Sequence, residues 1–104
     1  MIIEMRTYTI KTGKLKEFIN IYDKEIREIH TNILGNQIGF FYSEIGVLNQ
    51  VIHLYGYSSF EDRQKRREIL SRNDSFLKYI ENVKDLIISQ TNQLLLPTDF
   101  SKIK

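Results

Sequence analysis

The chain contains two histidines, His30 and His53, and no other side chain in it ordinarily titrates near neutral pH. His53 lies in the middle of the apolar run 51–57. A histidine there could transfer a proton during catalysis, or it could be a structural residue that is hydrogen-bonded inside an interface. His30 lies near the end of a predicted helix, where an imidazole interacts favourably with the helix C-terminus, and this is the role we expect for it.

Glu4, Arg6 and Tyr8 alternate along the first predicted strand, so their side chains share one face of the sheet. Charged groups on a central strand need partners, because burial of an unpaired charge is costly. The three residues therefore predict either a buried ion-pair network or the wall of a cleft that faces an anion. In an enzyme, Arg6 would stabilise an anionic oxygen of the substrate while His53 moves the proton.

Three tyrosines follow the middle strands of the predicted sheet, at Tyr42, Tyr55 and Tyr57. With Glu4 and Tyr8 they form the predicted substrate-binding set. Their rings could line a pocket for a flat aromatic or hydrophobic ligand, and their hydroxyls could orient it. The alternative is that these tyrosines pack in an interface.

The densest basic run of the chain consists of Arg63, Lys65, Arg66 and Arg67. Such a run could contact phosphates. Carboxylates at positions 61, 62 and 68 dilute its charge, which favours a solvated helix face.

The composition excludes several classes of protein. The chain has 104 residues, a formal net charge of +2 and no cysteine. The net charge is too small to indicate nucleic acid binding, and the lack of cysteine excludes disulfides, thiolate zinc sites and cysteine nucleophiles. Because the two histidines lie far apart in sequence, we expect no metal and no cofactor. No apolar run approaches the ~18 residues of a membrane span, and no signal peptide is visible, which predicts a cytoplasmic protein.

Four strands are predicted at residues 2–10, 37–45, 50–57 and 88–96, each rich in β-branched or aromatic residues. Helical patterns separate the first strand from the second and the third from the fourth. The order β-α-β-β-α-β favours one α+β domain over residues 1–104, with a ferredoxin-like antiparallel sheet whose helices all lie on one face.

Apolar spacing predicts one amphipathic helix from residue 14 to residue 34. The second helical region has an N-cap at Ser58 or Ser59. It is interrupted at Asn73 or Asp74, where a second cap begins a more apolar segment.

The middle strands do not alternate between apolar and polar residues as a half-exposed antiparallel sheet should. Residues 38–42 and 51–57 are largely apolar on both faces, yet the helices can cover only one. The remaining face has a footprint of roughly 400 Å², as large as the apolar patches that monomers expose. We therefore predict a homodimer; the alternative is that the C-terminal residues fold back over this face.

Five stretches of the sequence carry a family resemblance: residues 4–10 with Gly13-Lys14-Leu15, residues 46–57, Asp62-Arg63, residues 83–86, and residues 94–97. Through them the chain resembles the NIPSNAP family over nearly its whole length, although Tyr55 stands where that family most often has tryptophan.

This resemblance implies the dimeric α+β barrel superfamily, in which two ferredoxin-like sheets pack face to face. Relatives there include cofactor-free monooxygenases acting on quinol-like aromatics, and haem-binding or haem-degrading proteins. No activity is settled for the NIPSNAP family, so no catalytic residue is carried over.

We therefore predict a homodimer that binds a small hydrophobic or aromatic molecule, either in a cleft between sheet and helices or inside the barrel. As an enzyme it would be a cofactor-free oxygenase or isomerase that uses His53 and Arg6. A non-catalytic structural or interaction module is the alternative. Haem binding through His53 as axial ligand is a third hypothesis.

Overall fold

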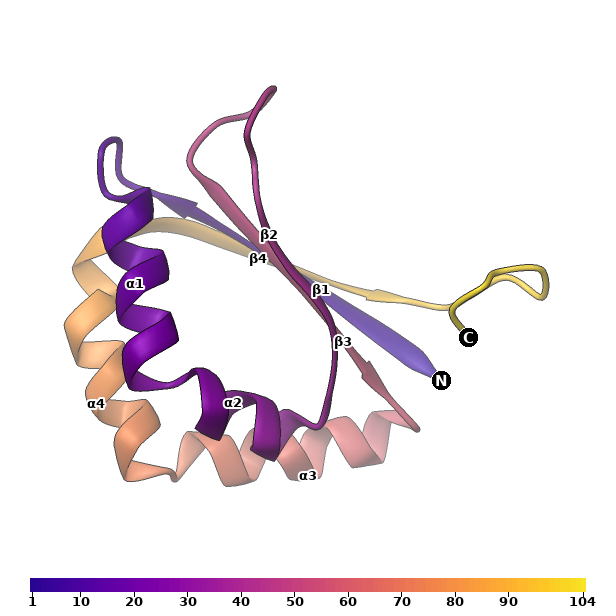
Figure 1. Cartoon of the computed structure of the whole chain (residues 1–104). Coiled ribbons are helices and arrows are strands. Elements are labelled where there is room, and N and C mark those ends of the chain that lie inside the picture. The colour runs from indigo at the N-terminus through magenta and orange to yellow at the C-terminus, as the bar shows by residue number, and fades with distance from the viewer.

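A four-stranded antiparallel sheet in the order β2-β3-β1-β4 carries every helix on one of its faces, as the computed structural model of residues 1–104 shows (Figure 1). The strands are β1 (Ile2–Ile10), β2 (Asn36–Tyr42), β3 (Gln50–Tyr57) and β4 (Ile87–Leu95). The two central strands are β1 and β3. This arrangement confirms the predicted ferredoxin-like α+β fold.

The second strand is shorter than predicted: β2 ends at Tyr42 rather than at residue 45. The chain then turns through a loop in which Gly46 and Asn49 have positive φ angles of 104° and 62°. The Ser43 N–H still donates to the Gln50 carbonyl at 3.0 Å, but residues 44 and 45 make no backbone hydrogen bond to β3, so the strand ends before them.

The helices are α1 (Leu15–Glu25), α2 (Arg27–Leu34), α3 (Phe60–Ser71) and α4 (Asp74–Val83), and a short 3₁₀ turn, η1 (Lys84–Leu86), precedes β4. The prediction of one unbroken first helix is wrong, because Ile26 leaves the helical conformation with φ −138°. The apolar stripe runs on across the break, since Tyr22, Ile26 and His30 are all buried. Periodicity alone therefore does not reveal the bend.

Two side-chain caps confirm the predicted start and interruption of the second helical region. The Ser59 hydroxyl accepts a hydrogen bond of 3.1 Å from the backbone N–H of Asp62. The Asn73 side-chain oxygen accepts one of 2.9 Å from the N–H of Phe76. Each cap satisfies an otherwise unpaired donor and contributes about 1 kcal/mol. Together they set where α3 and α4 begin.

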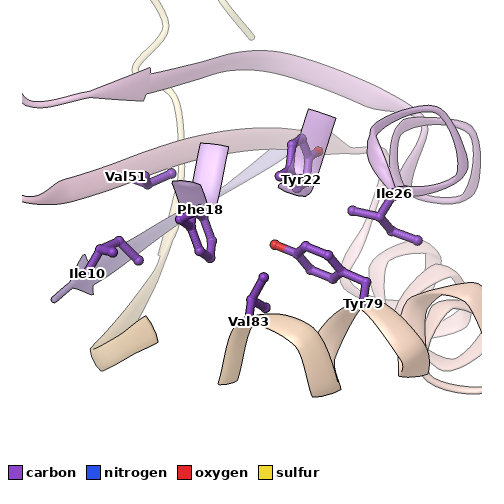
Figure 2. Close-up of a cluster of buried hydrophobic side chains, with 7 residues drawn as sticks. All are labelled: Ile10, Phe18, Tyr22, Ile26, Val51, Tyr79 and Val83. Atoms are coloured by element: carbon purple, nitrogen blue, oxygen red, sulfur yellow. The ribbon is translucent and has the colours of Figure 1, made fainter. Parts of the chain in front are cut away.

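The main core lies between the sheet and the helices α1 and α4. Its buried side chains are Ile10, Phe18, Tyr22, Ile26, Val51, Tyr79 and Val83 (Figure 2). A smaller cluster at the other end of the sheet contains Leu34, Tyr55, Tyr57 and Leu70. The polar residues of β1 and β3 lie between these two apolar clusters.

No helix covers the opposite face of the sheet (Figure 1). The strand register places Met5, Leu54, Ile52 and Phe41 there, and Phe41 is 55% exposed. The residues after β4 extend away from the sheet instead of folding back over it, which is the alternative that we considered for covering this face.

Candidate functional site

A cavity of about 260 Å³ lies between the sheet and the helices. Fourteen residues line it, of which nine are hydrophobic. The other five are Arg6, His30, His53, Arg67 and Gln90. Figure 2 shows part of the apolar wall, where side chains of α1 and α4 extend towards one another. An apolar hollow with a few convergent polar groups is the usual form of a small-molecule site.

His53 lies on β3 between an aromatic ring of each neighbouring strand. Its ring stacks on Phe40 with centroids 5.1 Å apart and on Tyr8 with centroids 5.4 Å apart. Burial lowers the pKa of His53 to about 2, and the nearby His30, Arg6 and Arg67 act in the same direction. The imidazole is therefore neutral at pH 7. Its Nδ1 atom is buried and has no hydrogen-bond partner.

His30, on α2, has a defined hydrogen-bonding role. Its Nδ1 lies 2.9 Å from the hydroxyls of both Tyr22 and Tyr55. Because Gln37 donates to the Tyr55 hydroxyl at 3.0 Å, that hydroxyl can direct its own proton to Nδ1. Burial lowers the pKa of His30 to about 3, with the charges of Arg67 and Arg6 contributing, so the ring is neutral. In the tautomer in which Nδ1 accepts the Tyr55 proton, the ring hydrogen is on Nε2. Nε2 makes no hydrogen bond within the chain, and the His30 side chain lines the cavity.

Glu4 is the centre of a buried ion-pair network. Arg63 of α3 donates to both carboxylate oxygens, at 3.2 and 2.7 Å, and Arg6 Nη1 donates to one of them at 3.1 Å. Burial alone would raise the pKa of Glu4, but the Arg63 hydrogen bond and the charges of Arg6 and Arg63 outweigh it and lower the pKa. The carboxylate is therefore ionised. Both of its oxygens accept hydrogen bonds from arginines, and Glu4 does not line the cavity.

Arg6 links this network to the cavity. Its Nε donates to the Tyr8 hydroxyl at 3.0 Å, while Nη1 is used by Glu4. Nη2 makes no hydrogen bond within the chain and is not fully buried. One edge of the guanidinium is thus left for a ligand.

Arg67 lies one turn after Arg63 on α3 and lines the same cavity. It makes no salt bridge and no hydrogen bond within the chain. Burial lowers the pKa of Arg67, and the charge of Arg6 adds to this effect. The expectation of a solvated basic face is wrong here, because Arg63 and Arg67 turn towards the sheet while Arg66 donates to the Ile33 carbonyl at 3.0 Å.

The predicted site residues divide into three groups. Arg6, Tyr8 and His53 line the cavity. Behind its wall, Glu4 pairs with the arginines and Tyr55 orients His30. The last group, Tyr57 and Tyr42, lies outside the cavity. Tyr57 is buried in the smaller cluster, and burial raises its pKa to about 12. Tyr42 lies at the end of β2 and is 56% exposed.

Eleven of the fourteen lining residues were not among the predicted site residues, including Tyr22, His30, Phe40, Arg67, Phe76 and Tyr79. The sequence signals that could have indicated these residues are helical spacings. Arg63 and Arg67 are four residues apart, and Phe76, Tyr79 and Val83 follow one helical stripe. Such a stripe predicts burial, but it does not distinguish a filled core from a hollow one.

The NIPSNAP family model matches residues 3–102 of the chain. The chain belongs to the NIPSNAP family. The protein NipSnap homolog of Dictyostelium discoideum is 31% identical over 94 residues, which are 90% of this chain and 41% of that protein. The chain thus spans less than half the length of this curated relative. A NIPSNAP family protein of Agrobacterium tumefaciens is 43% identical, with a TM-score of 0.96 over 99% of this chain and 98% of that one.

Two more distant structures share the fold. An antibiotic biosynthesis monooxygenase is 9% identical, with a TM-score of 0.67 over 94% of this chain and 99% of that one. A dimeric ferredoxin-like protein from an uncultured marine organism is 18% identical, with a TM-score of 0.75 over 97% and 91%. At these identities the likeness concerns the fold alone.

None of the helices is long and apolar enough to cross a membrane. No group of three or more His, Asp or Glu side chains is arranged to hold a metal ion.

Proposed function

We propose that this NIPSNAP-family chain binds a small aromatic or hydrophobic molecule in the cavity between its sheet and its helices. The observation that carries the proposal is an aromatic-walled hollow of about 260 Å³ whose lining includes five polar residues. A cavity of about 150 Å³ holds a benzene molecule, so this one accommodates one or two fused rings.

His53 favours a binding site over a structural module. Both ring nitrogens of a structural histidine in a core normally form hydrogen bonds. The Nδ1 atom of His53 has no hydrogen-bond partner within the chain. The His53 side chain also lines the cavity, so its ring forms part of the wall that a ligand would contact.

Binding is the function that the geometry supports more strongly than turnover. The low pKa of His53 makes it a weak base while the cavity is empty. A cofactor-free oxygenase or isomerase, with His53 as proton acceptor and Arg6 beside an anionic oxygen, is the second candidate, and the monooxygenase-like fold favours it. Haem binding through His53 as axial ligand stays a prediction from the sequence.

We further propose that the chain is a homodimer in which the second copy covers the helix-free face of the sheet. Met5, Ile52 and Leu54 share that face, and burying such apolar side chains is favourable. A structural neighbour that is described as dimeric has the same fold. A cytoplasmic location stays a prediction from the sequence.

A matched pair of variants on α4 tests the cavity. Ile80 lines the cavity, whereas Leu77 on the same helix is 49% exposed and does not. Saturation-transfer NMR with the neutral probes indole and 2-naphthamide should detect binding to the wild type and to Leu77→Trp. Ile80→Trp should abolish it, because the larger ring fills the hollow. Equal binding by both variants would place the ligand elsewhere and overturn the proposal.

A further inference from the structure

The charges beside the cavity do not balance. Three guanidinium groups, those of Arg6, Arg63 and Arg67, surround a single buried carboxylate, that of Glu4. Glu4 forms ion pairs with Arg6 and Arg63, and Arg67 forms none. The cluster therefore carries two positive charges more than it has negative ones.

Such an excess is unusual beside a protein core, because charged groups that are taken out of water are normally paired. The chain has no second carboxylate in salt-bridge contact with these arginines. Arg6 and Arg67 both line the cavity, so an anionic ligand bound there would supply negative charge next to them.

The unused hydrogen-bond donors point to the same conclusion. Arg6 Nη2 and all the N–H groups of Arg67 make no hydrogen bond within the chain. Both side chains line the cavity, and none of these nitrogen atoms is sealed in the interior. Guanidinium nitrogens are donors only, so they suit a group that only accepts, such as an oxyanion.

The apolar walls define the rest of the ligand. Phe76 and Tyr79 of α4 and Phe40 of β2 line the same hollow. Aromatic walls of this kind accept a flat ring by stacking or edge contacts. A planar anion attached directly to a ring fits both parts of the site.

We propose that the ligand of this cavity is an aromatic carboxylate whose anionic group binds Arg6 and Arg67 and whose ring lies among Phe40, Phe76 and Tyr79. This inference rests on the proposed function, because it names the class of molecule that the same cavity takes. A planar carboxylate can accept two parallel hydrogen bonds from one guanidinium, which a neutral ring substituent cannot do.

Calorimetric titration at pH 7 with 2-naphthoate and its neutral isostere 2-naphthamide tests the charge. The wild type should bind 2-naphthoate about tenfold or more tightly than 2-naphthamide, as expected for hydrogen bonds to a charged group. Arg67→Gln should remove most of this preference while keeping the binding of 2-naphthamide, and Arg67→Lys should retain part of it. Lys65→Gln removes the same charge from an exposed position of the same helix and should leave the preference unchanged.

Each outcome has a separate meaning. If both compounds bind the wild type equally, the proposal of an anionic ligand is wrong, but the proposal that the cavity binds an aromatic molecule is supported. If neither binds, the proposed function itself fails. A loss of preference in Lys65→Gln as large as in Arg67→Gln would show an effect of net charge and overturn the assignment to Arg67. Tighter binding of 2-naphthyl phosphate than of 2-naphthoate would overturn the carboxylate class.

Discussion

The imidazole of His53 lies nearly parallel to the ring of Phe40, with 10° between the two planes and 5.1 Å between the centroids. Tyr8, on the other neighbouring strand, stacks on it at 22°. His53 thus behaves as the middle member of a three-ring layer that runs across β2, β3 and β1. Its stacking surface stabilises the fold, whereas its unpartnered Nδ1 atom does not.

Because the ring surface stabilises the fold and the Nδ1 atom does not, two substitutions of His53 should differ in their effect on stability. His53→Phe keeps the stacking and removes a buried polar atom without a partner, so the free energy of unfolding should stay within about 1 kcal/mol of the wild type. His53→Ala leaves a cavity in the layer and should lower it by about 3 kcal/mol. Urea unfolding at pH 7 measures both. A large loss in His53→Phe would contradict the layer model, because it would mean that Nδ1 makes a stabilising hydrogen bond.

The two neutral histidines predict a fall in stability on acidification. Folding lowers the pKa of His53 from 6.5 to about 2 and that of His30 from 6.5 to about 3. Below pH 6.5 the unfolded chain therefore binds protons that the folded chain does not, so the free energy of unfolding falls as the pH falls. Each histidine contributes up to about 1.4 kcal/mol per pH unit.

Urea midpoints at pH 7.5, 6 and 5 measure this dependence. His53→Phe is the matched control, since it leaves His30 as the only histidine, and its slope between pH 6 and pH 5 should be about half that of the wild type. An unchanged slope in this variant, or a wild type that gains stability at pH 5, would contradict the prediction.

The fold could be predicted from sequence because its signals are local. Alternation and β-branched residues indicate the strands, and Ser59 and Asn73 mark the helix starts through caps formed within three residues. The break at Ile26 could not be predicted in this way, because the buried stripe continues through it. On either side of the bend the two helices have different partners, α4 for α1 and α3 for α2, which is a tertiary relationship that local spacing does not report.

The site was only partly predictable for the same reason. The positions of Arg6, Tyr8 and His53 follow from strand alternation and from the pairing of β1 with β3. The role of Arg67 depends on how α3 is rotated over the sheet, and its neighbours in the basic run include the exposed Lys65. A hollow, unlike a core, depends on what the side chains leave unfilled, and sequence spacing does not report that.

The helix-free face of the sheet predicts self-association. Ile52 is on the central strand β3 and belongs to this face with Met5 and Leu54. A charge at its centre would have to be buried without a partner when a second copy packs there, which is strongly unfavourable. Ile52→Asp should therefore convert a dimer of twice 12.4 kDa into a monomer of 12.4 kDa, as measured by light scattering at micromolar concentration. Ile45→Asp adds the same charge in the hairpin loop, where Ile45 is 91% exposed, and should leave the dimer intact. A wild type that is monomeric under these conditions, or dissociation by both substitutions, would show that this face is not the interface.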